Sequence, residues 1–161
     1  MHRLIYVSRS STPFQPDLQS ILQSSQKNNA RLGVTGALCF LDGVYCQYLE
    51  GDRNILADLY RLILTDLRHK ELKLIDFGRI PKHLYATWTM ALVTWNEQTR
   101  ALFKTVNQIN TPDLYAITTA SAAATFDALA NSSNWLELAT PAQNLVTTPS
   151  RVISKVALQN F

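Results

Sequence analysis

The side chain with the clearest chemical requirement in this sequence is Gln47. It lies in residues 33–51, where two apolar runs rich in β-forming residues are joined by Asp42 and Gly43. Asp-Gly is typical of a two-residue type I′ turn, so the segment predicts a β-hairpin. Because side chains alternate along a strand, Gln47 shares one face with Leu38, Phe40, Tyr45 and Leu49. A buried amide without a partner costs about 1–3 kcal/mol, so a backbone group, a tyrosine, a water molecule or a bound heterocycle is expected to hydrogen-bond it.

Other side chains could join this amide around one pocket. They supply a phenol, a thioether, an indole and two further carboxamides: Tyr6, Met90, Trp88, Asn28 and Asn29. Each has a more common structural alternative, since a buried tyrosine is usually a core residue, a lone methionine fills space, and an asparagine pair at a helix end is a cap. Together these residue types predict an amide-rich, redox-capable site in which a phenol and a carboxamide lie side by side.

The apolar pattern predicts the elements that position these side chains. Beside the hairpin, it predicts strands at residues 3–8, 72–80 and 86–95, and helices from Pro16 to near Asn29 and over residues 53–66. This order is typical of an α+β, ferredoxin-like fold (βαββαββ), one sheet with two helices on one face. In such a sheet the first strand is central. The strand of Gln47 is expected on one side of it and the last strand, with Met90, on the other.

Residues 97–161 differ in composition and are rich in Ala, Thr, Ser and Asn. The pattern predicts helices at residues 97–107, 119–130 and 150–160, with a loop at 131–149. These helices are expected to cover the open face of the sheet, where apolar side chains would otherwise be exposed. The sequence therefore predicts a body, residues 1–96, and a helical extension, residues 97–161.

Composition excludes several classes of protein. The chain has 161 residues, of which 47% are hydrophobic and 17% charged, and a net charge of +3, which is too weakly basic to favour nucleic acid. No apolar run could cross a membrane and no signal-peptide pattern is present, so a cytoplasmic location is expected. Cys39 and Cys46 are expected to be reduced thiols, and no metal site is expected. Without a phosphate-binding glycine loop or a nucleophile elbow, the chain is not expected to be an enzyme.

Six segments of the chain resemble, in order and spacing, the BLUF family of blue-light sensors, which bind a flavin non-covalently. They are RLIYVS (residues 3–8), SQKNN (25–29), GVTGALCF (33–40), QYLEG (47–51), DLRH (66–69) and WTM (88–90). The resemblance covers residues 1–96 and implies a flavin cofactor, FAD first, with FMN or riboflavin as alternatives. One departure bears on phosphate contacts: where many relatives have Arg before the residue matching Ile63, this chain has Leu62, with Arg61 one position earlier.

The resemblance also implies roles for the pocket residues. Tyr6 would donate an electron and then a proton to the excited flavin. Gln47 would lie between the phenol and the flavin, and its hydrogen bonds would reverse by rotation or tautomerisation. Met90 and Trp88 would carry the signal out of the site. The other implied cofactor contacts are Ile21 and Ile63 on the two sides of the ring, Asn29 on its polar edge with Asn28 beside it, Asp66 near the ribityl chain, and Ser25, Arg68 and His69.

The resemblance thus implies a short, stand-alone photoreceptor that transduces a blue-light signal by altered binding to a separate downstream protein. Homo-oligomer formation is a further hypothesis, and neither nucleic acid nor a membrane is an expected partner. Two alternatives stay open. A ferredoxin-like RNA-binding module would need exposed aromatic side chains on the open sheet face and clustered basic residues. A ligand-binding regulatory domain would lack photochemistry.

Overall fold

The computed structural model describes residues 1–12 and 16–137 of the chain. Its elements are β1 (His2–Ser10), α1 (Pro16–Leu32), β2 (Thr35–Leu41), β3 (Val44–Gly51), α2 (Arg53–Leu64), β4 (His69–Arg79), β5 (Ala91–Val93), α3 (Glu97–Asn107), the 3-10 turn η1 (Leu114–Ala116), α4 (Thr119–Ala130) and β6 (Trp135–Glu137). The strands form one mixed sheet in the order β4-β1-β3-β2-β5-β6. Among the described residues, no helix is long and apolar enough to span a bilayer.

The β2–β3 hairpin has the predicted register. Asp42 and Gly43 have φ angles of 51° and 76°, the left-handed values that a type I′ turn requires. The paired residues are Phe40 with Tyr45, Cys39 with Cys46 and Leu38 with Gln47. Strand β1 is central and pairs antiparallel with β3, which brings Tyr6 opposite Gln47. Both cysteines are free, buried thiols, as expected.

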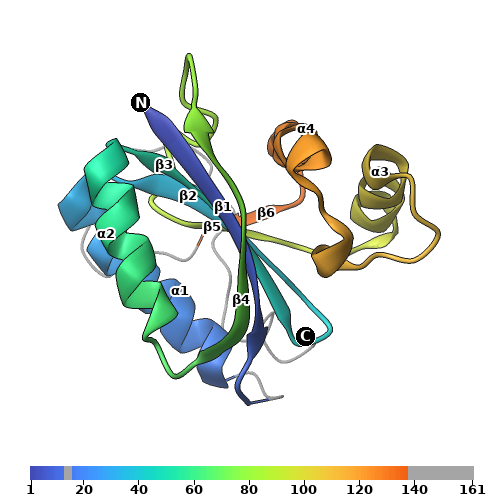
Figure 1. Ribbon diagram of the computed structural model, residues 1–161. Helices are drawn as coiled ribbons and strands as arrows, with labels where there is room; N and C mark the ends of the chain where they lie inside the picture. The colour runs from blue at the N-terminus through green and yellow to red at the C-terminus, as the bar shows by residue number, and fades with distance from the viewer. Residues whose placement is uncertain (13–15, 138–161) are drawn as a thin grey trace.

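The sheet separates two hydrophobic cores (Figure 1). On one face, α1 and α2 pack onto the strands through apolar side chains such as Ile21 and Leu56. On the other face, α3, η1 and α4 cover side chains that point the opposite way from the strands, among them Val7 and Tyr48. The fold is therefore α+β and ferredoxin-like, with C-terminal helices over the second face, as predicted.

Coverage of this second face bears on the RNA-binding alternative. A module of that kind stacks bases on exposed aromatic side chains of its sheet. Here Tyr48 and Tyr85 are buried, and both rings contact the ring of Phe126 on α4. The aromatic surface is used for packing, which disfavours the RNA-binding module.

The last strand is shorter than predicted and lies elsewhere. The sequence predicts a strand over residues 86–95, but only Ala91–Val93 form β5, so Trp88 and Met90 precede it. The prediction that this strand flanks β1 is also wrong. Strand β5 pairs parallel with β2, and β4 is the second neighbour of β1.

A long-range contact accounts for this path. The backbone N–H groups of Leu84 and Tyr85 donate to the buried carboxylate of Glu50 on β3, at 2.8 and 2.7 Å. These bonds hold the segment after β4 against β3, and the chain then continues to β5, which lies beside β2 on the side of the sheet away from β4. No local pattern in residues 86–95 encodes a contact with a residue more than thirty positions away.

Helix α1 runs one turn further than predicted, to Leu32. Gly33 has a φ of 65°, and the N–H of Val34 donates to the carbonyl of Asn29, the bond that closes a helix with a left-handed glycine. The asparagine pair at positions 28 and 29 therefore lies inside the helix and is not its cap.

Two further boundaries differ. Strand β4 begins at His69, not at residue 72, because beyond a register shift it pairs with β1 again. Within the predicted loop at 131–149, Trp135–Glu137 form β6 against β5. The rest of that loop and the predicted helix at 150–160 lie outside the described residues.

Phe126 provides a test of the packing between α4 and the sheet. Its side chain is fully buried, with its ring centre 5.2 Å from that of Tyr48. We expect Phe126→Ala to lower the free energy of unfolding by about 3–5 kcal/mol in urea titrations, because it removes buried apolar area and leaves a cavity. The control is Leu67→Ala, at a residue 90% exposed, which should cost less than about 0.5 kcal/mol. Equal costs for the two variants would contradict this packing.

Candidate ligand-binding site

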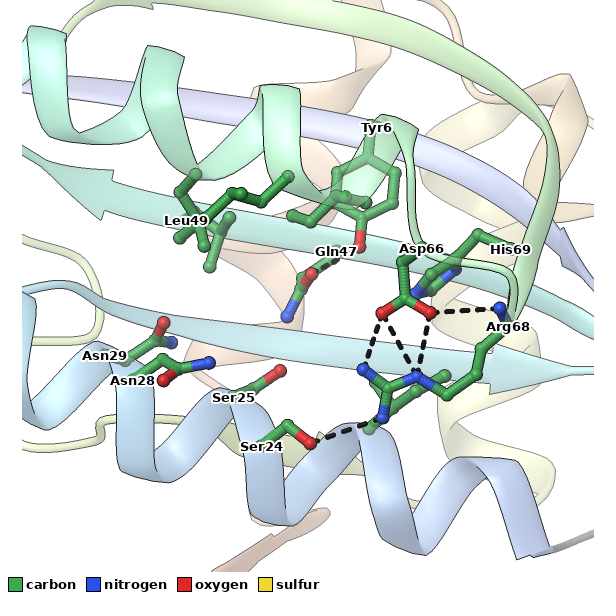
Figure 2. Close-up of a pocket in the computed structure, with 14 residues that line it drawn as sticks. Tyr6, Ser24, Ser25, Asn28, Asn29, Gln47, Leu49, Asp66, Arg68 and His69 are labelled. Carbon is green, nitrogen blue, oxygen red and sulfur yellow. Dashed lines mark hydrogen bonds and ion pairs between the residues drawn. The ribbon is translucent and has the colours of Figure 1, made fainter.

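A cavity opens between α1 and α2 on the sheet face that carries Gln47 (Figure 2). The space between its wall atoms is about 540 Å³, a volume that includes open solvent at the mouth. The wall combines apolar side chains with a phenol, amides, hydroxyls and an ion pair: Tyr6, Ile21, Ser24, Ser25, Asn28, Asn29, Gln47, Leu49, Leu59, Leu62, Ile63, Asp66, Arg68 and His69.

A relay of three buried side chains lies at the base of the cavity. The Tyr6 hydroxyl donates to Gln47 Oε1 at 2.5 Å, and Gln47 Nε2 donates to Met90 Sδ at 3.4 Å. Burial raises the pKa of the Tyr6 phenol far above its ordinary value, so the phenol is a hydrogen-bond donor throughout the neutral range. The carboxamide accepts on one side and donates on the other, as its two ends require.

Asn29 is fixed by a contact outside its own helix. It is 1% exposed, and its Nδ2 donates to the backbone carbonyl of Thr89 at 2.7 Å. This bond ties α1 to the segment that ends in Met90. Ser25, one turn earlier on α1, and Asn28, the neighbour of Asn29 in sequence, also line the cavity (Figure 2).

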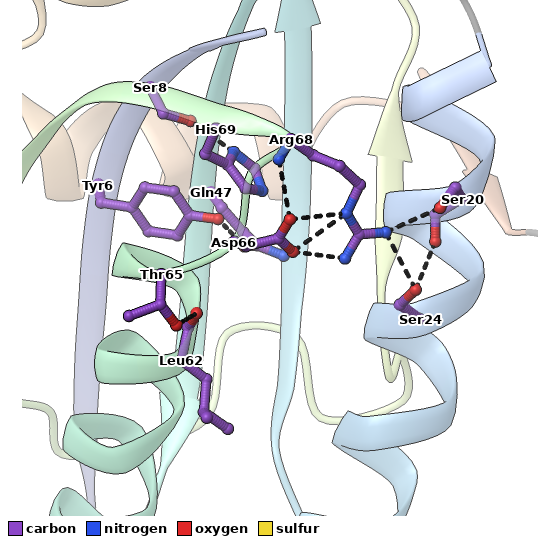
Figure 3. Close-up of polar contacts among 10 residues, drawn as sticks. All are labelled: Tyr6, Ser8, Ser20, Ser24, Gln47, Leu62, Thr65, Asp66, Arg68 and His69. Atoms are coloured by element: carbon purple, nitrogen blue, oxygen red, sulfur yellow. Dashed lines mark hydrogen bonds and ion pairs between the residues drawn. The ribbon is translucent and has the colours of Figure 1, made fainter. Parts of the chain in front are cut away.

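An ion pair in the turn between α2 and β4 is hydrogen-bonded to α1 at one end of the cavity (Figure 3). The Arg68 guanidinium donates to both carboxylate oxygens of Asp66, at 2.9 Å to Oδ1 and 2.5 Å to Oδ2. The same guanidinium donates to the hydroxyls of Ser20 and Ser24 on α1, at 2.8 and 3.2 Å. Hydrogen bonding from Arg68 lowers the pKa of the Asp66 carboxyl, against the opposing effect of burial. The pair therefore brings no net charge to the site.

His69 completes this end of the cavity. Its Nδ1 lies 2.8 Å from the hydroxyl of buried Ser8, and its ring centre is 6.1 Å from that of Tyr6. Ser8 lies where the β1–β4 ladder shifts register, so its side chain points toward the histidine (Figure 3). This hydrogen bond fixes the ring orientation of His69 beside the phenol.

Ten of the predicted cofactor residues line this one cavity: Tyr6, Ile21, Ser25, Asn28, Asn29, Gln47, Ile63, Asp66, Arg68 and His69. Met90 contacts Gln47 from behind the wall. Trp88 lies on the opposite face of the sheet, half-buried, with its ring centre 6.1 Å from that of Tyr85. The roles of these residues toward a cofactor stay predictions.

Four lining residues are absent from the sequence-based prediction: Ser24, Leu49, Leu59 and Leu62. Spacing could have indicated Ser24, because positions 20, 24 and 28 recur every four residues and share one side of a helix. Arg61 does not replace the arginine that the resemblance leads one to expect at position 62. It pairs with Asp58 at 2.6 Å, and it is not part of the cavity wall.

The side chains around the cavity fit a flat heterocycle with a polar edge. Ile21 and Ile63 offer apolar contacts from the two helices, and the phenol and carboxamides offer donors and acceptors at the base. Fold and site together define a receptor domain for a small aromatic ligand. The family description "Sensors of blue-light using FAD" matches residues 1–91. The chain belongs to this family, BLUF, which binds FAD as its chromophore.

Individual known proteins are also similar to this chain. Photoactivated adenylate cyclase subunit beta of Euglena longa is 32% identical over 93 residues, which cover 56% of this chain and 11% of that protein. The dark-state structure of BlrB, a BLUF protein, is 29% identical, with a TM-score of 0.67 over 80% of this chain and 94% of that chain. The ground state of BlsA, at 23% identity, matches 99% of both chains with a TM-score of 0.75 and shows the same fold.

Proposed function

We propose that this chain is a blue-light photoreceptor in which Tyr6 and Gln47 form the switch. The observation that carries the proposal is the 2.5 Å hydrogen bond from the Tyr6 hydroxyl to Gln47 Oε1, at the base of a cavity in a family that uses FAD. Phenol and carboxamide are both buried, so water does not compete for this bond.

Tyr6 and Gln47 act in sequence. The bound flavin supplies absorption of blue light and an electron-accepting excited state. Tyr6 would give an electron and then its phenolic proton to that excited flavin, which would remove the donor that holds Gln47 Oε1. The carboxamide then rotates or tautomerises, and Tyr6 recovers its electron and proton against the reversed amide. The outcome is a changed hydrogen bond from Gln47 to the chromophore, seen as a red shift of its absorption.

The other wall residues hold the chromophore. Ile21 and Ile63 contact the two faces of the ring, and Asn29 binds its polar edge. Around the ribityl and phosphate groups we place Asp66 and Arg68, with the remaining predicted contacts Ser25, Asn28 and His69 nearby. The hydrogen bonds from Arg68 to Ser20 and Ser24 on α1 support this placement, because they keep that end of the cavity at a fixed width.

The output is a light-dependent change in binding to a separate protein. Residues 1–96 form the sensor, and residues 97–161 form the extension that the signal reaches through Met90, Trp88 and β5. A role for the extension is supported by the packing of α3, η1 and α4 on the sheet, and homo-oligomer formation through the extension is part of the proposal. The chain spans 11% of its cyclase relative from Euglena longa, so no catalytic activity is transferred to it.

The test is the absorption spectrum of the purified chain. We expect a yellow protein that releases flavin on denaturation, with chromatography separating FAD, FMN and riboflavin. Blue light should shift the absorption to longer wavelength, and darkness should reverse the shift. A colourless protein that takes up no added flavin, or a bound flavin that only bleaches, would contradict the proposal.

A further inference from the structure

Glu50 is a fully buried carboxylate that the photoswitch chemistry does not use. It lies three residues after Gln47 on β3, and its side chain points to the opposite face of the sheet. Its oxygens accept hydrogen bonds from the Thr35 and Tyr48 hydroxyls, at 2.9 and 3.2 Å. Within the described chain, none of its hydrogen-bond partners is Lys or Arg. A buried charge is costly unless it is fully hydrogen-bonded, so this site needs further partners.

The remaining partners come from the segment between β4 and β5. The N–H groups of Leu84 and Tyr85 donate at 2.8 and 2.7 Å, and His83 Nδ1 lies at 3.1 Å, where it can only donate to a carboxylate. Three consecutive residues are thus bound by one side chain. We call this contact the Glu50 clamp.

The segment held by the clamp continues to Met90, whose sulfur contacts the Gln47 carboxamide. From Tyr85 it continues through Trp88, whose carbonyl accepts from the N–H of Gly36 on β2, to Met90. Met90 Sδ then accepts from Gln47 Nε2 at 3.4 Å. The segment therefore leaves β3 at Glu50 and returns to it at Gln47. The clamp, together with the bonds from Gly36 to Trp88 and from Asn29 to Thr89, holds the backbone that carries the sulfur.

The position of the sulfur matters because a thioether can accept a hydrogen bond but cannot donate one. In the present arrangement Gln47 presents Nε2 to Met90, which is favourable. After the amide reverses, Oε1 faces the same sulfur, and two acceptors oppose each other. A firmly placed Met90 thus favours the present arrangement over the reversed one.

We propose that Glu50 is a positioning residue for the photoswitch, which acts through Met90 to speed the return of Gln47 in darkness. This inference rests on the proposed function. Met is flexible, so when one of the contacts that hold its backbone is lost, its sulfur can move away and no longer oppose the reversed amide. Loss of the clamp then prolongs the light-adapted state and leaves the initial shift intact.

The test is the rate of dark recovery in Glu50→Gln. The amide keeps the size of the side chain but directs an NH₂ group at a backbone N–H, so the clamp opens. We expect recovery to slow about three- to tenfold, the range of one weak hydrogen bond, with a red shift of unchanged size. Asp76→Asn is the control. It replaces a partly buried carboxylate that pairs with Arg3 on β1 and lies outside the clamp, so the recovery rate should be unchanged.

A double-mutant cycle separates positioning from general destabilisation. In a Met90→Leu background the sulfur is absent, so Glu50→Gln should have no additional effect on recovery. Additive effects, or a wild-type rate in Glu50→Gln, would overturn the proposal. If Glu50→Gln does not fold, His83→Ala at a side chain 41% exposed should slow recovery in the same direction, and an unchanged rate there would also overturn it.

Different results would contradict the proposed function and the role of Glu50. A flavin-loaded wild-type chain without any light-induced shift contradicts the proposed function itself. A normal shift in the wild type with equal recovery rates in wild type and Glu50→Gln contradicts only the role of Glu50.

Discussion

Tyr6→Phe is expected to keep flavin bound and to lose the light-induced red shift entirely. The ring remains, so the cavity wall and its apolar contacts are preserved. The hydroxyl that donates to Gln47 Oε1 at 2.5 Å is removed, and with it the group that yields a proton. The measurement is the difference spectrum between illuminated and dark protein, with flavin content determined from the same sample.

The matched control is Tyr45→Phe. Tyr45 lies on β3 on the same face of the sheet and is equally buried, but it is not part of the cavity wall. Its hydroxyl lies 3.4 Å from that of Ser10, away from the switch amide. This variant should shift normally. A normal photocycle in Tyr6→Phe would refute the assignment of that residue as donor.

Gln47→Leu is expected to have an effect of the same size for a different reason. Leucine fills the space of the carboxamide but can neither accept from Tyr6 nor donate to the chromophore. Flavin should stay bound while the red shift disappears from the difference spectrum. A red-shifted state that persists in this variant would show that the amide is dispensable.

Thermal unfolding gives this substitution an independent readout. Gln47→Leu leaves the buried Tyr6 hydroxyl without its acceptor, which should cost about 1–3 kcal/mol. Adding Tyr6→Phe removes both partners and should recover part of that stability, since an unsatisfied buried group is costlier than an absent one. Strictly additive losses would contradict the direct bond between the two side chains.

Much of the site was predictable because its elements are encoded locally. The Asp42-Gly43 turn sets the register of the hairpin, and the register decides which face Gln47 occupies. Strand order in this fold then places Tyr6 opposite Gln47. Helical periodicity places Ile21 and Ile63 on the apolar stripes of α1 and α2, and the resemblance to the family implied that both line the cavity.

The rest depends on contacts between distant residues. The path to β5 follows from Glu50 binding Leu84 and Tyr85, and the opposite placement of Met90 and Trp88 follows from that path. The bond from Arg68 to Ser20 joins residues 48 positions apart. Such contacts have no periodic signature, so sequence patterns alone could not predict them.

The most direct measurement is a crystal structure of the flavin-loaded chain grown in darkness. The account predicts the ring between Ile21 and Ile63, with its polar edge within hydrogen-bond distance of Gln47 and Tyr6 hydrogen-bonded to the same amide. A flavin bound elsewhere, for example in the hollow between the segment at residues 80–84 and α4, would contradict it.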